Sequence, residues 1–265
     1  MYDFAYHRPT SVADAVALLS ADPEARPIAG GQTLIPTLKQ RLARPTALVD
    51  LSGIAELKGI TVSGGMVRIG GMTTHAAVAA SPEVAKAIPA LARLAAHIGD
   101  NQVRNRGTIG GSVANNDPAA DYPAAVLGLG ANVHTSARTI PADEFFTGMF
   151  STALEPGEIV TAVSFPIPEK AAYMKFPNPA SRYAMVGVFV AKGPAGVRVA
   201  VTGAGANGVF RHAAMEAALA KNWSPDALEG IITPQDDLNG DIHASKEYRA
   251  HLIGVMARRA VAAAG

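Results

Sequence analysis

The sequence predicts an α+β protein of two domains, and three features of the 265-residue chain predict it. Near the N-terminus a helix, a short strand, a glycine-rich turn and a second helix follow one another, which is an α/β pattern. From residue 59 onward, short alternating strands are interspersed with helices. Beyond a proline-rich stretch at 166–182, an antiparallel hairpin is followed by further helices. A chain of this length is expected to form about two domains.

The N-terminal elements follow from apolar spacing and from breakers. Thr10 and Ser11 offer capping hydroxyls to a helix over 11–21, in which apolar residues recur every three or four positions. Prolines then end this helix, and residues 47–51 form a short apolar strand. Pro36 is placed to open a second helix, because proline suits the first helical turn.

The next part of the chain changes to strand periodicity. Apolar residues alternate from Ile60 to Ile69 around Ser63-Gly64-Gly65, which is typical of a hairpin. Thr73 and Thr74 predict the start of a helix that runs to about residue 80. Another helix has an apolar face of Leu91, Leu94, Ala95 and Ile98 and ends at Gly99, and strands are expected at 131–140 and 158–166.

The C-terminal part is predicted to be a hairpin with helices. Strands at 184–191 and 197–202 flank the turn 192–196, and helices are expected at about 212–221 and 244–264. Tyr248, Leu252, Val255, Met256 and Arg259 share one face of the last helix, so this face should pack on the sheet. The prolines of 166–182 indicate the domain boundary.

Composition excludes several classes of function. The formal net charge is +1 without a basic stripe, so nucleic acid is not an expected partner. The N-terminus has charges and a proline where a signal peptide needs an apolar run, and no stretch approaches about 18 apolar residues, so we expect a cytoplasmic protein without a transmembrane segment. The chain has no cysteine, which excludes disulfides, thiol catalysis and Cys-ligated clusters within it.

Two glycine-rich motifs are the strongest indication of function. The first is AGGQTLIP at 29–36, and the second is TIGGS at 108–112, where a strand-like apolar residue leads into paired glycines. Glycine pairs let backbone amides approach an anion that side chains would otherwise keep away. Two such motifs predict a diphosphate held between them, although glycine pairs also form ordinary turns. Asp117 and Asp121 follow the second motif and suit sugar or ribityl hydroxyls, or alternatively a turn.

Other motifs suggest different functions. Gly203-Ala204-Gly205-Ala206-Asn207-Gly208 reads GxGxxG, but too little chain follows it for a doubly wound sheet, and no acidic residue ends a second strand about 20 residues later. A free-standing NAD-binding dehydrogenase using these glycines therefore stays the alternative function. A third hypothesis is a hydrolase using Ser112, which lacks the final glycine of a nucleophile elbow. The seven histidines show no metal-ligand spacing and are expected at the surface or its boundary.

AGGQTLIP at 29–36 and QVRNRGTIGGSVANNDPAADYPA at 102–124 resemble the two FAD-pyrophosphate motifs of the flavin subunit, or medium chain, of molybdenum hydroxylases in the xanthine oxidase family. FFTGMFSTALEPGEIV at 145–160 and YRAHLIGVMARRAV at 248–261 fit the same pattern. Within that family, the aerobic carbon monoxide dehydrogenase medium chains are the most similar branch.

The resemblance implies a PCMH-type FAD-binding domain over residues 1–170, with subdomains of about 1–56 and 57–170, and a C-terminal domain over 171–265. It places Tyr183 beside the isoalloxazine ring and Lys175 at the ring's polar edge. Two positions depart from the family pattern. Many relatives have a His-Ser or Asn-type pair where this chain has Gln32-Thr33, and an acidic residue where it has Arg182. The predicted cofactor-binding residues are Ile28, Ala29, Gly30, Gly31, Gln32, Thr33, Leu34, Thr108, Ile109, Gly110, Gly111, Ser112, Asn115, Asp117, Asp121, Lys175 and Tyr183.

The family resemblance also implies the assembly in which the chain works. FAD would be bound without a covalent cysteinyl link, and the flavin supplies its own redox chemistry. An iron–sulfur small subunit with two [2Fe–2S] clusters and a large subunit with a molybdopterin cofactor would complete a heterotrimer, dimerised to a heterohexamer. Electrons would leave molybdenum, cross the clusters, reach FAD and pass to an external acceptor.

Overall fold

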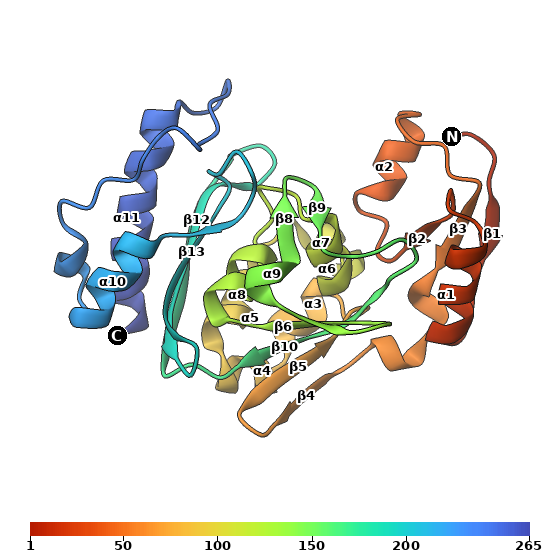
Figure 1. The fold of residues 1–265 in the computed structure, drawn as a ribbon, viewed down its shortest axis with the longest axis horizontal. Coiled ribbons are helices and arrows are strands. Elements are labelled where there is room, and N and C mark those ends of the chain that lie inside the picture. The colour runs from red at the N-terminus through yellow and green to blue at the C-terminus, as the bar shows by residue number, and fades with distance from the viewer.

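The computed structural model describes residues 1–265 and confirms the predicted α+β architecture. Three sheet-containing units follow one another along the long axis of the molecule, from the N-terminal unit to the C-terminal one (Figure 1). Each unit has its own cluster of buried apolar residues. None of the helices combines the length and the apolar character needed to cross a membrane.

The N-terminal unit is a three-stranded parallel sheet in the order β1-β3-β2. Ser11 caps helix α1 by accepting a hydrogen bond from the Asp14 amide, and Ala15 and Leu19 of this helix are buried in the unit's core. Pro36 is the third residue of α2 rather than the first, and it is tolerated because amides of the first turn need no helical acceptor. The elements are β1 (Ala5–His7), α1 (Val12–Ala21), β2 (Arg26–Ile28), α2 (Leu34–Lys39), β3 (Ala47–Asp50), η1 (Leu51–Gly53) and η2 (Ala55–Leu57).

The middle unit is a five-stranded antiparallel sheet in the order β4-β5-β10-β6-β7, covered by helices. Ser63 pairs with Met66 across the predicted Gly64-Gly65 turn, where both glycines have positive φ. The elements are β4 (Ile60–Ser63), β5 (Met66–Gly70), α3 (His75–Ala80), α4 (Pro82–Ala87), α5 (Pro89–Ala96), α6 (Asn101–Arg106), α7 (Ile109–Asn115), α8 (Tyr122–Leu129), β6 (Asn132–Thr135), β7 (Thr139–Pro141), α9 (Ala142–Phe145), β8 (Phe146–Gly148), β9 (Ser151–Thr152) and β10 (Val160–Pro166).

The second glycine motif differs from its predicted conformation. Ile109 is not strand-like, because Thr108 caps α7 and the glycine pair lies in the first turn of this helix. The Thr108 hydroxyl accepts a hydrogen bond from the Gly111 amide, and Gly110 packs against the backbone of Gly71. The short helix α4, which Ser81 caps and Pro82 opens, was not predicted.

The C-terminal unit is a four-stranded antiparallel sheet in the order β11-β12-β13-β14. Val188 and Val190 of β12 are buried in the C-terminal core with helix α11, whereas Phe189 is buried in the core of the middle unit. The stretch predicted as a boundary, 166–182, contains strand β11. The elements are β11 (Lys170–Pro177), β12 (Ala184–Gly193), β13 (Gly196–Thr202), β14 (Phe210–Arg211), α10 (Ala213–Lys221), η3 (Pro225–Leu228) and α11 (Lys246–Ala264).

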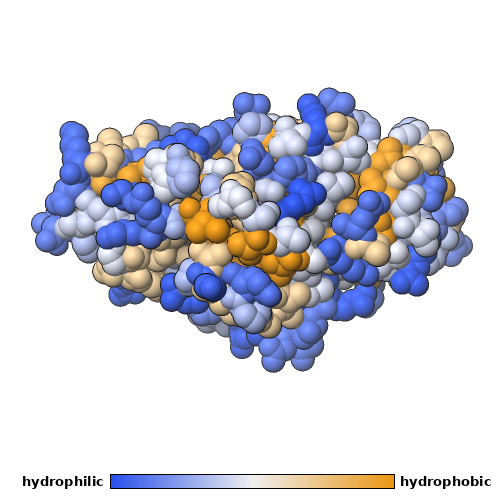
Figure 2. All heavy atoms as spheres, turned by 90° about the horizontal axis from the view of Figure 1, so that it is seen from below, coloured by the Kyte–Doolittle hydropathy of each residue, from blue (hydrophilic) through white to orange (hydrophobic).

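The packing face of α11 was predicted only in part. Leu252 and Met256 are buried as expected, but Tyr248 is 42% exposed and Arg249 is buried in its place. The Arg249 guanidinium donates to the carbonyls of Met185 and Gly203, which offsets the cost of burying its charge. Seen from below in Figure 2, the molecular surface mixes polar residues with small apolar patches near the middle of the face.

Candidate functional site

Both glycine motifs line one cavity of about 630 Å³, a volume within the range of cofactor sites. Its walls come from the turn after β2, from the stretch between α6 and α8, from the β9–β10 connection and from the loop before β12. Most of the predicted binding residues line it: Ile28, Ala29, Gly30, Gly31, Gln32, Thr33, Leu34, Thr108, Gly110, Gly111, Ser112, Asn115, Asp117, Asp121 and Tyr183. Ile109 points into the core instead, and Lys175 stands behind Asp121.

The first glycine motif presents free backbone amides to the cavity. The amides of Gly31, Gln32 and Thr33 have no acceptor within the protein, although all three residues line the cavity. Gly31 has φ +74°, a conformation that a side chain would strain. A Cβ added at Gly30 would lie 2.1 Å from the carbonyl oxygen of Arg106, so only glycine lets this turn pack against the second motif.

The second motif contributes close approach and hydroxyls rather than free amides. The amide of Ile109 donates to Thr73 O at 3.1 Å, and that of Gly110 donates to Gly71 O at 2.9 Å. Because the Thr108 hydroxyl accepts from Gly111, the expectation of free amides from both turns is wrong for this one. A Cβ at Gly111 would be in ordinary contact with Ala29 Cβ, at 3.5 Å, so the two motifs approach each other closely where both line the cavity.

Asp121 is a buried carboxylate in the cavity wall. Its side chain is 4% exposed and pairs at 2.9 Å with the Lys175 ammonium, which is 5% exposed. The Tyr173 hydroxyl also donates to this carboxylate. Burial raises the pKa of Asp121, and the positive charge of Lys175 opposes that rise. Lys175 comes from β11, so the pair ties the cavity to the C-terminal sheet.

Asp117 lines the same wall of the cavity and is less buried than Asp121. One of its oxygens accepts from the Ala119 amide at 2.8 Å, which is a local turn contact, and burial raises the pKa of this carboxyl. The turn and the ligand interpretations of Asp117 are therefore compatible, because its second carboxylate oxygen accepts no hydrogen bond within the protein and can accept one from a ligand.

The loop between β11 and β12 brings an aromatic residue to the mouth of the cavity. Asn178 holds this loop, since its side-chain oxygen accepts from the amides of Ala180 and Ser181 and its own amide donates to Tyr183 O. Tyr183 is 47% exposed and lines the cavity beside Arg182, whose φ of +62° is unusual for a residue with a side chain. An exposed ring at the mouth is available for stacking on a ligand.

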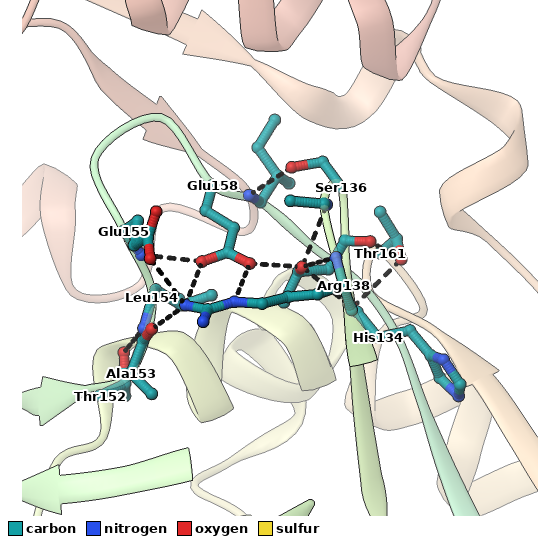
Figure 3. Close-up of polar contacts among 12 residues, drawn as sticks. His134, Ser136, Arg138, Thr152, Ala153, Leu154, Glu155, Glu158 and Thr161 are labelled. Atoms are coloured by element: carbon teal, nitrogen blue, oxygen red, sulfur yellow. Dashed lines mark hydrogen bonds and ion pairs between the residues drawn. The ribbon is translucent and has the colours of Figure 1, made fainter. Parts of the chain in front are cut away.

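Sequence reasoning missed the wall formed by Glu158. Its carboxylate accepts from the Thr135 hydroxyl at 2.6 Å, from the Arg138 guanidinium at 3.2 Å and from the Glu155 amide at 2.8 Å (Figure 3). These bonds hold the pKa of Glu158 below its ordinary value despite burial of the group. Arg138 also donates to Ala153 O, so the network fixes the β9–β10 connection that lines the cavity.

His75 was also missed, because isolated histidines were expected at the surface. It is 5% exposed and lines the cavity at the start of α3. Its backbone amide donates to Gly107 O at 2.9 Å, a contact between residues that are far apart in the sequence.

The other predicted motifs do not form sites. Gly203, Gly205 and Gly208 lie in the β13–β14 loop, where Gly205 bridges to Leu238, and none of them lines the cavity. This loop precedes a strand rather than a helix, so the structure does not support a dinucleotide fingerprint there. The hydrolase hypothesis needs a histidine bonded to Ser112. The histidine rings that form hydrogen bonds do so with other residues. No group of three acidic or histidine side chains is placed to ligate a metal.

Comparisons with known proteins show which family the chain resembles over nearly its full length. Residues 2–168 match the family "FAD binding domain in molybdopterin dehydrogenase", and residues 171–264 match "CO dehydrogenase flavoprotein C-terminal domain". The carbon monoxide dehydrogenase medium chain of Afipia carboxidovorans is 38% identical, over 97% of this chain and 95% of its own length. The nicotine 6-hydroxylase medium subunit of Paenarthrobacter nicotinovorans is 36% identical, over 98% and 96%. A solved structure of reconstituted CO dehydrogenase from Oligotropha carboxidovorans superposes with a TM-score of 0.90 at 37% identity, covering 99% of this chain and 98% of that one.

Proposed function

The chain belongs to the family of flavoprotein medium subunits of molybdenum hydroxylases, and from this premise we propose that it holds FAD in the cavity between its two glycine motifs as one component of such an enzyme. The observation that carries the proposal is the single cavity lined by both motifs, with the free amides of Gly31, Gln32 and Thr33 on one side. The bound flavin supplies the redox chemistry, and the protein holds and orients it.

A diphosphate suits the residues that meet in the cavity. Amide and hydroxyl donors stabilise an anion without bringing a competing counter-charge, and hydrogen bonds to charged groups are about twice as strong as neutral ones. The first motif supplies main-chain donors, whereas Thr108 and Ser112 supply hydroxyls and Gly111 leaves space. The pyrophosphate therefore fits between the turns, with the two motifs contributing in different ways.

The acidic residues and Tyr183 would contact the remaining parts of FAD, which are its hydroxyl groups and its isoalloxazine ring. Asp117 has an oxygen left to accept a ribityl or ribose hydroxyl, and Asp121 lines the same wall. We expect Tyr183, which lines the cavity and is exposed, to lie against the isoalloxazine ring. Since the Lys175 ammonium is already paired with Asp121, we expect Lys175 to act on the ring's polar edge by positioning that carboxylate.

The absence of cysteine bears on the partners that we propose. Without thiolates this chain cannot ligate iron–sulfur clusters, so electrons must come from another subunit. We expect a small subunit with two [2Fe–2S] clusters and a large molybdopterin subunit, in a heterotrimer that pairs into a heterohexamer. Electrons would pass from the clusters through FAD to an external acceptor. Residues 1–170 would form the FAD-binding domain and 171–265 the C-terminal domain.

The experiment that tests the proposal is an absorption spectrum of the purified chain. We expect a yellow protein with flavin bands that releases FAD on denaturation, and an apo form that takes up added FAD at one site. Copurification of a cysteine-rich small chain and a molybdenum-containing large chain tests the assembly. A chain that binds NAD instead of FAD would refute the proposal.

A further inference from the structure

His75 is a buried imidazole that the glycine motifs do not account for. It is 5% exposed, lines the cavity, and is held by its backbone bond to Gly107. Gly107 directly precedes Thr108, so the ring lies beside the backbone that leads into the second glycine motif. Buried polar side chains almost always have a hydrogen-bond partner, so one without a partner at the wall of a ligand cavity requires an explanation.

The ring of His75 is confined on two sides. A Cβ added at Gly107 would be 2.5 Å from Nε2, so only glycine at this position leaves room for the imidazole. On another side the Tyr122 ring packs at a centroid distance of 5.3 Å with a tilt of 45°. The two contacts fix the ring's orientation before any ligand binds, which is the preorganisation expected of a binding group.

The hydrogen-bonding state of the ring follows from its surroundings. Nδ1 is buried and has no hydrogen-bond partner in the protein. Burial, together with the positive charge of Arg104, lowers the pKa of His75 to about 4, so the ring is neutral at physiological pH. A neutral imidazole carries one N–H and one bare nitrogen. Because buried N–H groups without acceptors are rarer than unsatisfied acceptors, the proton is assigned to Nε2.

We propose that His75 is a further cofactor-binding residue, whose Nε2–H beside Gly107 donates a hydrogen bond to an oxygen of the bound dinucleotide. This inference rests on the proposed FAD site and adds to it a side-chain donor that is neutral. A neutral donor keeps its proton across the physiological range, so the contact does not depend on pH there.

Replacement variants of the full chain test the assignment. His75→Leu removes the donor, and we expect the FAD dissociation constant to rise about tenfold or more, as for the loss of one hydrogen bond to a charged or strongly polar group. His75→Gln keeps a side-chain N–H at similar reach and should stay within about threefold of the wild type. The matched control is His212→Leu, which removes a buried histidine bonded to Thr233 away from the cavity and should leave FAD affinity unchanged.

A nitrogen NMR experiment tests the same contact without any substitution. In protein labelled with ¹⁵N-histidine, the His75 ring should show the Nε2–H tautomer, and its Nε2 resonance should shift when FAD is added. Wild-type affinity in His75→Leu, or an Nε2 resonance that does not respond to FAD, would overturn the inference. If the wild-type chain itself fails to bind FAD, the proposed function has failed instead, so the two failures are distinguishable.

Discussion

Substitution of Gly30 by alanine tests how the cofactor site is assembled. The added Cβ would lie 2.1 Å from Arg106 O, whereas ordinary contact begins at 3.4 Å. The obstacle is backbone, so the first glycine turn must move away by about 1 Å, at a cost of about 1–3 kcal/mol typical of overpacking. Its free amides would move with it, and loss of one hydrogen bond to a charged group costs about 1.5–3 kcal/mol. We therefore expect FAD affinity to fall about 10- to 100-fold.

The assay is equilibrium titration of the apo chain with FAD, followed by flavin fluorescence, alongside urea unfolding. Gly205→Ala is the matched control, because its Cβ would meet another backbone oxygen, Gly208 O, at 2.3 Å in a loop that does not line the cavity. Both variants should lose stability, but only Gly30→Ala should lose FAD affinity. Affinity within twofold of the wild type for Gly30→Ala, or an equal loss in both variants, would refute the reasoning.

Three further substitutions test the walls of the site. Lys175→Met leaves Asp121 buried without its ion pair, so the free energy of unfolding should drop by about 3–5 kcal/mol at pH 8. Burial raises the pKa of Asp121, so the loss should become smaller as the pH is lowered and the carboxyl takes up a proton; urea unfolding over a series of pH values measures this. Glu158→Gln should destabilise the chain by about 1–2 kcal/mol at pH 7. Because the folded pKa of Glu158 is lowered, its contribution is present above the unfolded pKa and is lost as pH falls, so a difference that persists unchanged at pH 3 would contradict this. Thr108→Val removes the cap on Gly111 and should cost about 1 kcal/mol, while Thr108→Ser should cost almost nothing; thermal unfolding distinguishes them.

The parts of the fold that the sequence predicted are those that depend on local patterns. The helix predicted over 11–21, which spans 12–21 with Ser11 as its cap, and the hairpins at Gly64-Gly65 and 192–196 follow from caps, apolar spacing and turn residues, and each was confirmed. The glycine motifs were likewise visible, because close backbone approach leaves a sequence signature.

The parts that could not be predicted depend on contacts between distant residues. The amides of Ile109 and Gly110 in the second motif donate to Thr73 and Gly71, which lie more than thirty positions earlier in the chain. His75 is buried because Gly107 leaves room for it, and no periodicity in either segment shows this. Arg249 could take a buried position in α11 only because carbonyls of another element meet its guanidinium.

Strand β12 serves two cores at once, with Val188 and Val190 on one side and Phe189 on the other. The Phe189 ring rests on α8, where a Cβ at Gly128 would come within 2.9 Å of it. In chimeras that exchange the C-terminal part between relatives, the side chains at the Phe189 and Gly128 positions must therefore be compatible with each other. A recipient with a larger side chain at the Gly128 position would force the halves apart even if the linker between them were perfectly chosen.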